Sequence, residues 1–194
     1  MVANATVRIN YNGVYYNLIE YNKEKYAEVA RMSSGKYTGS VVIPSTVTFY
    51  NVTYNVTSIG FEAFAYCYDL TTVIIGNGVT SIGDWAFRNC YVLTDLYCYA
   101  EKVPTTRSLS ELFRGTPVYT ATLHVPAASI DAYKAADQWK EFGTIVALTP
   151  EETGVKPITA TENPSDRKFM ENGRLIIQKN GQYYNATGQM VKEK

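Results

Sequence analysis

Val56-Thr-Ser-Ile-Gly-Phe-Glu-Ala-Phe-Ala-Tyr-Cys-Tyr-Asp-Leu-Thr-Thr-Val73 realigns onto Val79-Thr-Ser-Ile-Gly-Asp-Trp-Ala-Phe-Arg-Asn-Cys-Tyr-Val-Leu-Thr-Asp-Leu96, which begins 23 residues further along the chain. The matched positions are mainly apolar or glycine, as in the pairs Val56/Val79, Ile59/Ile82, Gly60/Gly83, Ala63/Ala86, Phe64/Phe87, Cys67/Cys90 and Leu70/Leu93. A fixed offset of this size is typical of repeat proteins, in which each copy stacks on the next. The sequence therefore predicts stacked repeats.

Each repeat is predicted to contain a short strand, a turn at Gly76-Asn77-Gly78, a second extended segment and a short helical turn. None of these elements can bury its apolar side alone, so neighbouring copies must supply the core. The inward side chains are expected to be Leu70, Val73 and Ile75 in the strand, Val79 and Ile82 in the second segment, and Ala86, Phe87 and Cys90 in the helical turn.

Further copies are expected on both sides of this pair. A degenerate copy lies at Gly39–Val47, and a hairpin-like insertion, Thr48–Asn55, separates it from the next repeat. About three repeats are needed for a stable stack. The predicted strand rungs are Ser40–Ile43, Thr71–Ile75 and Thr94–Cys98, with a possible fourth at Ala121–Val125.

The ends of the repeat region carry their own signals. Asn12-Gly13 between Val7–Tyr11 and Val14–Leu18 predicts a β-hairpin, and a third strand is expected at Tyr26–Met32. We expect this hairpin to cover the open edge of the first rung. After the repeats, Ser129–Trp139 predicts a helix with Ser129 as N-cap and with Ile130, Tyr133 and Ala136 facing inward.

The motif Val-Thr-Ser-Ile-Gly-x-x-Ala-Phe-x-x-Cys-x-x-Leu-Thr at Val79–Thr94 resembles the BspA-like leucine-rich repeat family of bacterial surface proteins. Val42-Ile-Pro-Ser-Thr-Val47 and the closing segment from Leu123-His-Val-Pro126 to Trp139-Lys-Glu-Phe142 resemble the same family. The resemblance covers about Val7 to Leu148. It implies export, surface attachment or secretion, and binding to proteins or other surface ligands.

The predicted fold class is mainly β with short helical turns, arranged as a short leucine-rich-repeat solenoid with an N-terminal β-hairpin cap and a C-terminal helix cap. We expect an N-terminal β cap at residues 1–38, repeats with a capping helix at 39–148, a polar linker at 149–167 and a C-terminal β-hairpin tail at 168–194. The tail is either a domain-closing hairpin about Asn180-Gly181 or a sorting signal, because it also resembles C-terminal tails of exported proteins.

Composition excludes several classes of partner. Lys plus Arg and Asp plus Glu number 18 each, so the formal net charge is zero and nothing implies binding to nucleic acid or to an anionic membrane. No stretch reaches the roughly 18 apolar residues that a membrane span needs. Met1–Thr6 has neither a basic nor an apolar region, so the chain is either cytosolic or has lost an export signal. We favour a lost signal, and with it a secreted or cell-surface location, on the strength of the family resemblance.

The sequence does not contain a convincing catalytic or metal-binding pattern. His124, the single histidine, alternates with apolar residues in Leu123-His-Val125 and is predicted to lie on the surface of a strand. The Asp and Glu residues are scattered, and no glycine-rich phosphate loop follows a strand. Cys67, Cys90 and Cys98 form no CxxC pair and are expected to be buried thiols. We therefore predict a protein that is not an enzyme and that uses no cofactor and no metal.

The remaining candidate is the outward side of the strands. If Leu70, Val73 and Ile75 face inward, the outward residues on two neighbouring rungs are Thr72, Ile74, Asp95, Tyr97 and Tyr99, with Ser40 and Val42 on the first. Repeat proteins use such a face for partners, and tyrosine is a favoured contact residue. These tyrosines either bind a ligand or simply cover the sheet.

We consider three functions. The first is a monomeric extracellular binding or adhesion module for a protein ligand at the cell surface or in host matrix. The second is a carbohydrate-binding or uptake accessory protein, because sugars stack on aromatic rings. The third, an enzyme, is supported only by His124 and dispersed carboxylates.

Overall fold

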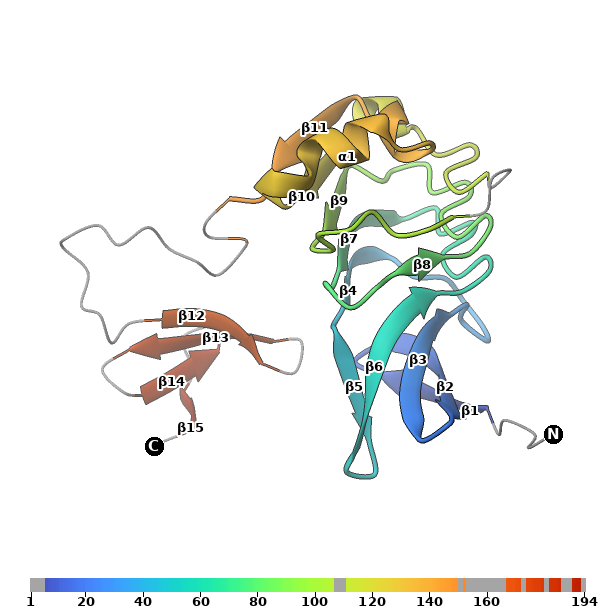
Figure 1. Ribbon diagram of the computed structural model, residues 1–194. Helices are drawn as coiled ribbons and strands as arrows, with labels where there is room; N and C mark the ends of the chain where they lie inside the picture. The colour runs from blue at the N-terminus through green and yellow to red at the C-terminus, as the bar shows by residue number, and fades with distance from the viewer. Residues whose placement is uncertain are drawn as a thin grey trace. The chain divides into compact units, whose positions relative to one another are not determined.

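The computed structural model describes residues 6–106, 111–149 and 152, together with the backbone of strands at 167–171, 174–179, 182–185 and 190–192 (Figure 1). The chain divides into two compact units, Met1–Ala147 and Leu148–Lys194. The chain is mainly β, as predicted.

The first unit contains a five-stranded sheet in which every neighbouring pair is parallel. Its order is β11-β10-β9-β7-β4, and its strands are β4 (Gly39–Ile43), β7 (Leu70–Ile75), β9 (Asp95–Cys98), β10 (Thr122–Val125) and β11 (Thr144–Ala147). The four predicted rungs are confirmed within a residue or two. The sequence analysis missed the fifth strand, β11.

The second sheet of this unit is mixed, with the order β1-β2-β3-β6-β5. Its strands are β1 (Val7–Tyr11), β2 (Val14–Tyr21), β3 (Glu24–Ala30), β5 (Thr46–Phe49) and β6 (Val52–Ile59), and the short β8 (Ser81–Ile82) pairs with β6. The predicted hairpin forms about Asn12 and Gly13, whose φ angles are 52° and 86°. The insertion at 48–55 is also a hairpin, formed by β5 and β6.

The N-terminal hairpin does not extend the parallel sheet. Within the described residues β4 is the last strand of its sheet, and the hairpin does not pair with it. Instead β3 lies parallel to β6, with Tyr26 opposite Asn55 and Val29 opposite Ile59. The β2 residues Tyr16 and Leu18 and the β3 residue Val29 are buried in the shared core.

The segments at 60–68 and 83–91 are successive reverse turns, so the predicted helical turn is wrong. Along the first of these segments, successive peptide N–H groups donate alternately to a carbonyl of the same repeat and to a carbonyl of the next repeat. Those of Ala63, Ala65 and Cys67 donate three residues back, to Gly60, Glu62 and Phe64. Those of Glu62, Phe64 and Tyr66 donate to carbonyls of the next repeat, at Asp84, Ala86 and Arg88. An α-helix would use all these donors internally, so stacking of the repeats requires turns.

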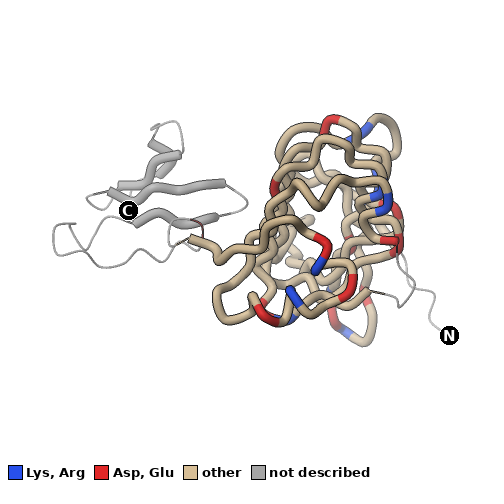
Figure 2. The backbone as a smooth tube through the Cα atoms, turned by 90° about the horizontal axis from the view of Figure 1, so that it is seen from above, with Lys and Arg blue, Asp and Glu red and all other residues tan. Residues whose placement is uncertain are grey.

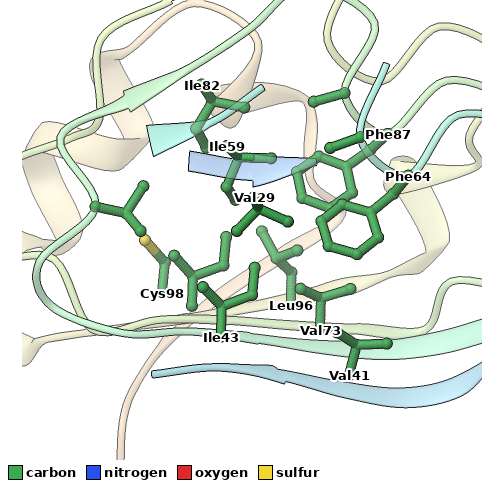
Figure 3. Packing of buried hydrophobic residues seen from close by; sticks show 14 of the residues in the cluster. Val29, Val41, Ile43, Ile59, Phe64, Val73, Ile82, Phe87, Leu96 and Cys98 are labelled. Carbon is green, nitrogen blue, oxygen red and sulfur yellow. The ribbon is translucent and has the colours of Figure 1, made fainter. Parts of the chain in front are cut away.

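The core lies between the two sheets and the turn layer. Figure 3 shows Val41, Ile43 and Val73 pointing toward Val29 and Ile59, which come from the opposite sheet. The inward residues predicted for the repeat are all buried: Leu70, Val73, Ile75, Val79, Ile82, Ala86, Phe87 and Cys90. In the predicted capping helix, Ile130 and Ala136 are partly buried. The three cysteines are free, buried thiols, as expected.

An aromatic stack runs through the turn layer. Phe64 and Phe87 lie parallel at 5.2 Å between ring centroids, and Phe87 stacks on Phe113 at 5.5 Å. Tyr37 lies 4.9 Å from Phe64 at one end, and Trp139 packs edge-on to Phe113 at the other. Each such pair contributes about 0.5–1.5 kcal/mol beyond the burial of its area.

Threonines form hydrogen bonds between successive repeats in the layers of the two sheets. In Thr80 both the N–H and the hydroxyl donate to the carbonyl of Thr57, at 2.9 and 3.2 Å. Thr94 makes the same two bonds to Thr71, and Thr105 makes them to Thr80. In the repeated Val-Thr and Leu-Thr pairs, the apolar residue thus faces the core. The hydroxyl of the threonine next to it donates a second hydrogen bond between repeats.

Short helices follow β9 and β10: η1 (Val118–Thr120), η2 (Ala127–Ser129), α1 (Ile130–Ala135) and η3 (Trp139–Glu141). In α1 the predicted inward Tyr133 is fully buried, and its hydroxyl donates to the carbonyl of Ala100 at 2.9 Å. The predicted N-cap bond of Ser129 is absent. Its hydroxyl donates to the carbonyl of Glu101 instead, which joins α1 to the preceding repeat.

The second unit has an antiparallel four-stranded sheet, β12 (Arg167–Glu171), β13 (Arg174–Lys179), β14 (Gln182–Asn185) and β15 (Met190–Lys192), in that order. The expected hairpin strands correspond to β13 and β14, with Lys179 opposite Gln182. Most of the expected linker at 149–167 lies outside the described residues.

Candidate binding face of the parallel sheet

The outward side of the parallel sheet is built by simple alternation. In β7 and β9 the inward residues are buried, whereas the residues between them are partly or fully exposed. The same pattern occurs in β4 and β10. Because neighbouring strands are paired in register, outward residues at the same level form continuous rows across the sheet.

Two rows of different chemistry result. The polar row is Ser40, Thr72, Asp95, Thr122 and Thr144. The apolar row is Val42, Ile74, Tyr97, His124 and Val146. With strands about 4.8 Å apart, five residues span about 19 Å. The outward face is therefore a strip of hydroxyl groups and one carboxylate beside a strip of aliphatic and aromatic groups.

Tyr97 and His124 form the centre of the apolar row. Their rings stack at 4.0 Å between centroids, with 14° between planes. The Nε2 atom of His124 lies 3.2 Å from Asp95 Oδ1 and donates to it, which links the apolar row to the polar one. The side chain of His124 is 14% exposed and that of Asp95 is 35% exposed. These contacts hold three side chains in fixed positions.

The structure brings together the five residues named from the sequence. Thr72 lies opposite Asp95 and Ile74 lies opposite Tyr97 in the β7–β9 pair. Tyr99 lies just beyond the end of β9, and its N–H still donates to the carbonyl of Ile75 at 2.9 Å. All five are partly exposed.

Sequence reasoning placed His124 on a strand surface but not in this cluster, and it did not include Thr122, Thr144 or Val146. The alternation of Thr122 and His124 with buried Leu123 and Val125 was a usable signal. No comparable signal existed for β11, whose residues are all partly or fully exposed.

The thiols and the histidine lie on opposite sides of the sheet or in different layers. Cys98 faces the core from β9, and Cys67 and Cys90 lie in the turn layer, whereas His124 faces outward. Within the described part of the chain, no three His, Cys, Asp or Glu side chains are grouped as a metal site would require. Among the described residues, no helix combines the length and the apolar character that a membrane crossing needs.

Surface charges lie in mixed pairs. Figure 2 shows basic and acidic residues next to one another on the loops of the first unit. The described ion pairs include Lys25–Glu20, Arg31–Glu62, Arg114–Glu111 and Lys140–Asp137. The outward face is therefore not part of a large field of one sign.

Comparison with known proteins gives the following matches. The family described as BspA type leucine rich repeat region matches residues 41–132. No curated protein matches the chain.

Among solved structures, a leucine rich cell surface protein from Faecalibacterium prausnitzii is 16% identical, with a TM-score of 0.40, 95% of this chain covered and 62% of that one. The pneumococcal vaccine antigen PcpA is 13% identical, with a TM-score of 0.44 and coverages of 76% and 39%. A leucine-rich repeat protein from Bacteroides ovatus is 21% identical, with a TM-score of 0.38 and coverages of 74% and 41%.

The chain thus spans less than two thirds of the length of each of these solved chains. The family match begins in β4 and ends in α1, so it contains the strands β4, β7, β9 and β10 that carry most of the outward face. The repeat region of the chain, residues 41–132, belongs to the BspA-type leucine-rich repeats, a non-enzymatic repeat family.

Proposed function

We propose that the chain is a non-catalytic, extracellular binding module that presents the outward face of its parallel sheet to a protein ligand at the bacterial surface. The observation that carries this proposal is the pair of rows in register, with the stacked Tyr97 and His124 at their centre. Leucine-rich repeat domains generally bind proteins. The residues that we propose as contacts are Thr72, Ile74, Asp95, Tyr97 and Tyr99.

The chemistry of the face suits a protein surface. Aliphatic and aromatic groups in one row can bury apolar area, and the neighbouring hydroxyls can satisfy polar groups at its margin. Tyrosine supplies a large contact area at low entropic cost. Contacts between Tyr97, His124 and Asp95 restrict these side chains before a ligand arrives, which reduces the entropy lost on binding.

The architectural part of the proposal is a short solenoid formed by residues 39–148. In it the β-strands of residues 1–38 close the first end and α1 with β11 closes the second. The parallel pairing from β4 to β11 supports this arrangement. We further propose that the linker and tail, residues 149–167 and 168–194, form a separate domain and that the protein acts as a secreted or surface-attached monomer.

A pull-down against purified host matrix proteins tests the function. We expect saturable binding that falls at least tenfold in Tyr97→Ala and measurably in Tyr99→Ala. Tyr21→Ala is the matched control, because Tyr21 is 57% exposed and lies on β2 of the other sheet. Binding that Tyr97→Ala and Tyr99→Ala leave unchanged would remove the proposed face.

A further inference from the structure

A groove of about 410 Å³ on the other sheet of the first unit is lined by residues of β6 and β8. This volume is in the range of small-molecule sites. The side chains that give the groove its chemistry are Glu28, Ser58, Phe61, Ser81, Asp84 and Thr105. None of these residues belongs to the face proposed above, so the groove is a separate site.

The polar side of the groove is another row in register. Glu28 of β3 lies opposite Ser58 of β6, Ser58 lies opposite Ser81 of β8, and Ser81 bridges to Thr105. The neighbouring residues Val29, Ile59 and Ile82 are buried. Alternation therefore directs a carboxylate and three hydroxyls outward from four successive levels of the stack.

The hydrogen bonds of this row leave acceptor atoms available to a ligand that is rich in hydrogen-bond donors. The carboxylate of Glu28 accepts from Asn17 Nδ2 at 3.3 Å and from Ser58 Oγ at 3.5 Å, which leaves further lone pairs on both oxygens. The hydroxyl of Thr105 donates to the carbonyl of Thr80, so its oxygen can still accept. The row offers mainly acceptors at fixed positions.

An aromatic ring, that of Phe61, also lines the groove. Phe61 is 60% exposed, and its ring lies 5.4 Å from that of Trp85. Trp85 is itself held, because its Nε1 donates to Glu111 at 3.2 Å and the guanidinium of Arg88 lies 5.1 Å from its ring centroid. Phe61 thus adds an exposed apolar surface to a groove with polar side chains, and the contacts of Trp85 restrain its neighbouring ring.

This combination selects the class of ligand. Two acidic side chains, Glu28 and Asp84, line the groove, and its described lining includes no Lys or Arg, so an anionic ligand is disfavoured. A purely apolar ligand would leave the hydroxyl row without solvent or partner. A neutral saccharide has hydroxyl donors for the acceptor row and an apolar C–H face for the ring. We propose that this groove binds a neutral saccharide.

The experiment applies the full chain to an array of neutral oligosaccharides (glucans, mannans and galactans) beside sialylated and sulfated glycans. The neutral glycan with the strongest signal is then titrated by calorimetry. We expect neutral glycans alone to bind. Phe61→Ala should raise Kd at least tenfold, and Ser81→Val, which replaces a hydroxyl with methyl groups, should raise it at least fivefold.

Two controls separate this site from other surfaces. Tyr68→Ala removes another exposed aromatic ring of the turn layer, 48% exposed and not part of the groove lining, and should leave Kd unchanged. Tyr97→Ala should also leave saccharide binding unchanged, and Phe61→Ala should leave protein binding unchanged, so the two proposals can fail independently. Absence of any neutral-glycan signal, preference for acidic glycans, or binding that Phe61→Ala does not weaken would each overturn the proposal.

Discussion

Tyr97 and His124 lie face to face across β9 and β10, at 4.0 Å between ring centroids. They are partners in the parallel register, so the backbone pairing sets their separation. Asp95 holds the edge of the imidazole at 3.2 Å from the neighbouring row. The position of the rings thus depends on the stack of strands, and a ligand would meet a preformed surface.

Replacement of His124 should affect binding more than stability. His124→Ala removes one ring stack and one hydrogen bond at a partly exposed position, so we expect the free energy of unfolding to fall by about 1–2 kcal/mol. We expect protein binding to weaken as well, because Tyr97 loses its support. Urea denaturation and the pull-down measure the two effects. A stability loss above about 3 kcal/mol would show instead that His124 acts as a core residue.

Phe87 occupies the middle of the aromatic stack, between Phe64 and Phe113, and is fully buried. Phe87→Ala leaves a cavity that the rigid turns on both sides cannot close, so we expect a loss of about 3–5 kcal/mol in the free energy of unfolding. Phe61→Ala is the matched control because that ring is 60% exposed, and it should change stability by less than about 1 kcal/mol. Similar losses for the two variants in urea denaturation would contradict the stacked core.

Gly83 is required by the close approach of two repeats. A Cβ at this position would lie 2.7 Å from the peptide nitrogen of Phe61, and the Gly83 N–H donates to the carbonyl of Ile59 at 2.8 Å. Gly83→Ala should therefore push adjacent levels apart and cost about 1–3 kcal/mol. The neighbouring Ser81→Ala has no such conflict and should cost less than about 0.5 kcal/mol. Equal thermal unfolding temperatures for both variants would refute this role of Gly83.

Much of the fold could be predicted because the repeat itself encodes it. The offset of 23 residues aligns Val73 with Leu96 and Phe64 with Phe87, and both pairs lie side by side in the structure. The period-two alternation within each rung then determines which residues face outward. For this reason Thr72, Ile74, Asp95, Tyr97 and Tyr99 could be placed on one side from the sequence.

What was missed depends on contacts outside the repeat. The spacing of Ala86, Phe87 and Cys90 fits a helical turn, but it does not reveal that half of the N–H groups donate to the adjacent repeat. The pairing of β3 with β6 joins segments about 30 residues apart and leaves no local pattern. The groove was missed for the same reason, because Glu28 meets Ser58 only through that pairing.

The buried thiol and phenol groups should make the folded protein less stable at high pH. Burial raises the pKa of the Cys90 thiol from 9.0 to about 12, and it also raises the pKa of Cys67 and of Cys98. Burial raises the pKa of Tyr37 from 10.0 to about 12. In the unfolded chain these groups ionise near their ordinary pKa values, whereas the folded chain keeps their protons.

The sign of the effect follows from proton counting. Below about pH 8 both states hold the protons, and stability does not depend on these groups. Between about pH 9 and 12 the folded state binds more protons than the unfolded state, so stability falls as pH rises, by up to about 1.4 kcal/mol per pH unit for each group. We expect the urea midpoint to be level from pH 7 to 8 and to fall increasingly from pH 9 to 11. Cys90→Ala should begin from a lower midpoint but show a shallower fall, because one group is gone. In the native protein at pH 8 the three thiols should react with a thiol reagent only after urea is added. A midpoint that stays constant to pH 11, or rapid native labelling, would place these thiols in contact with solvent.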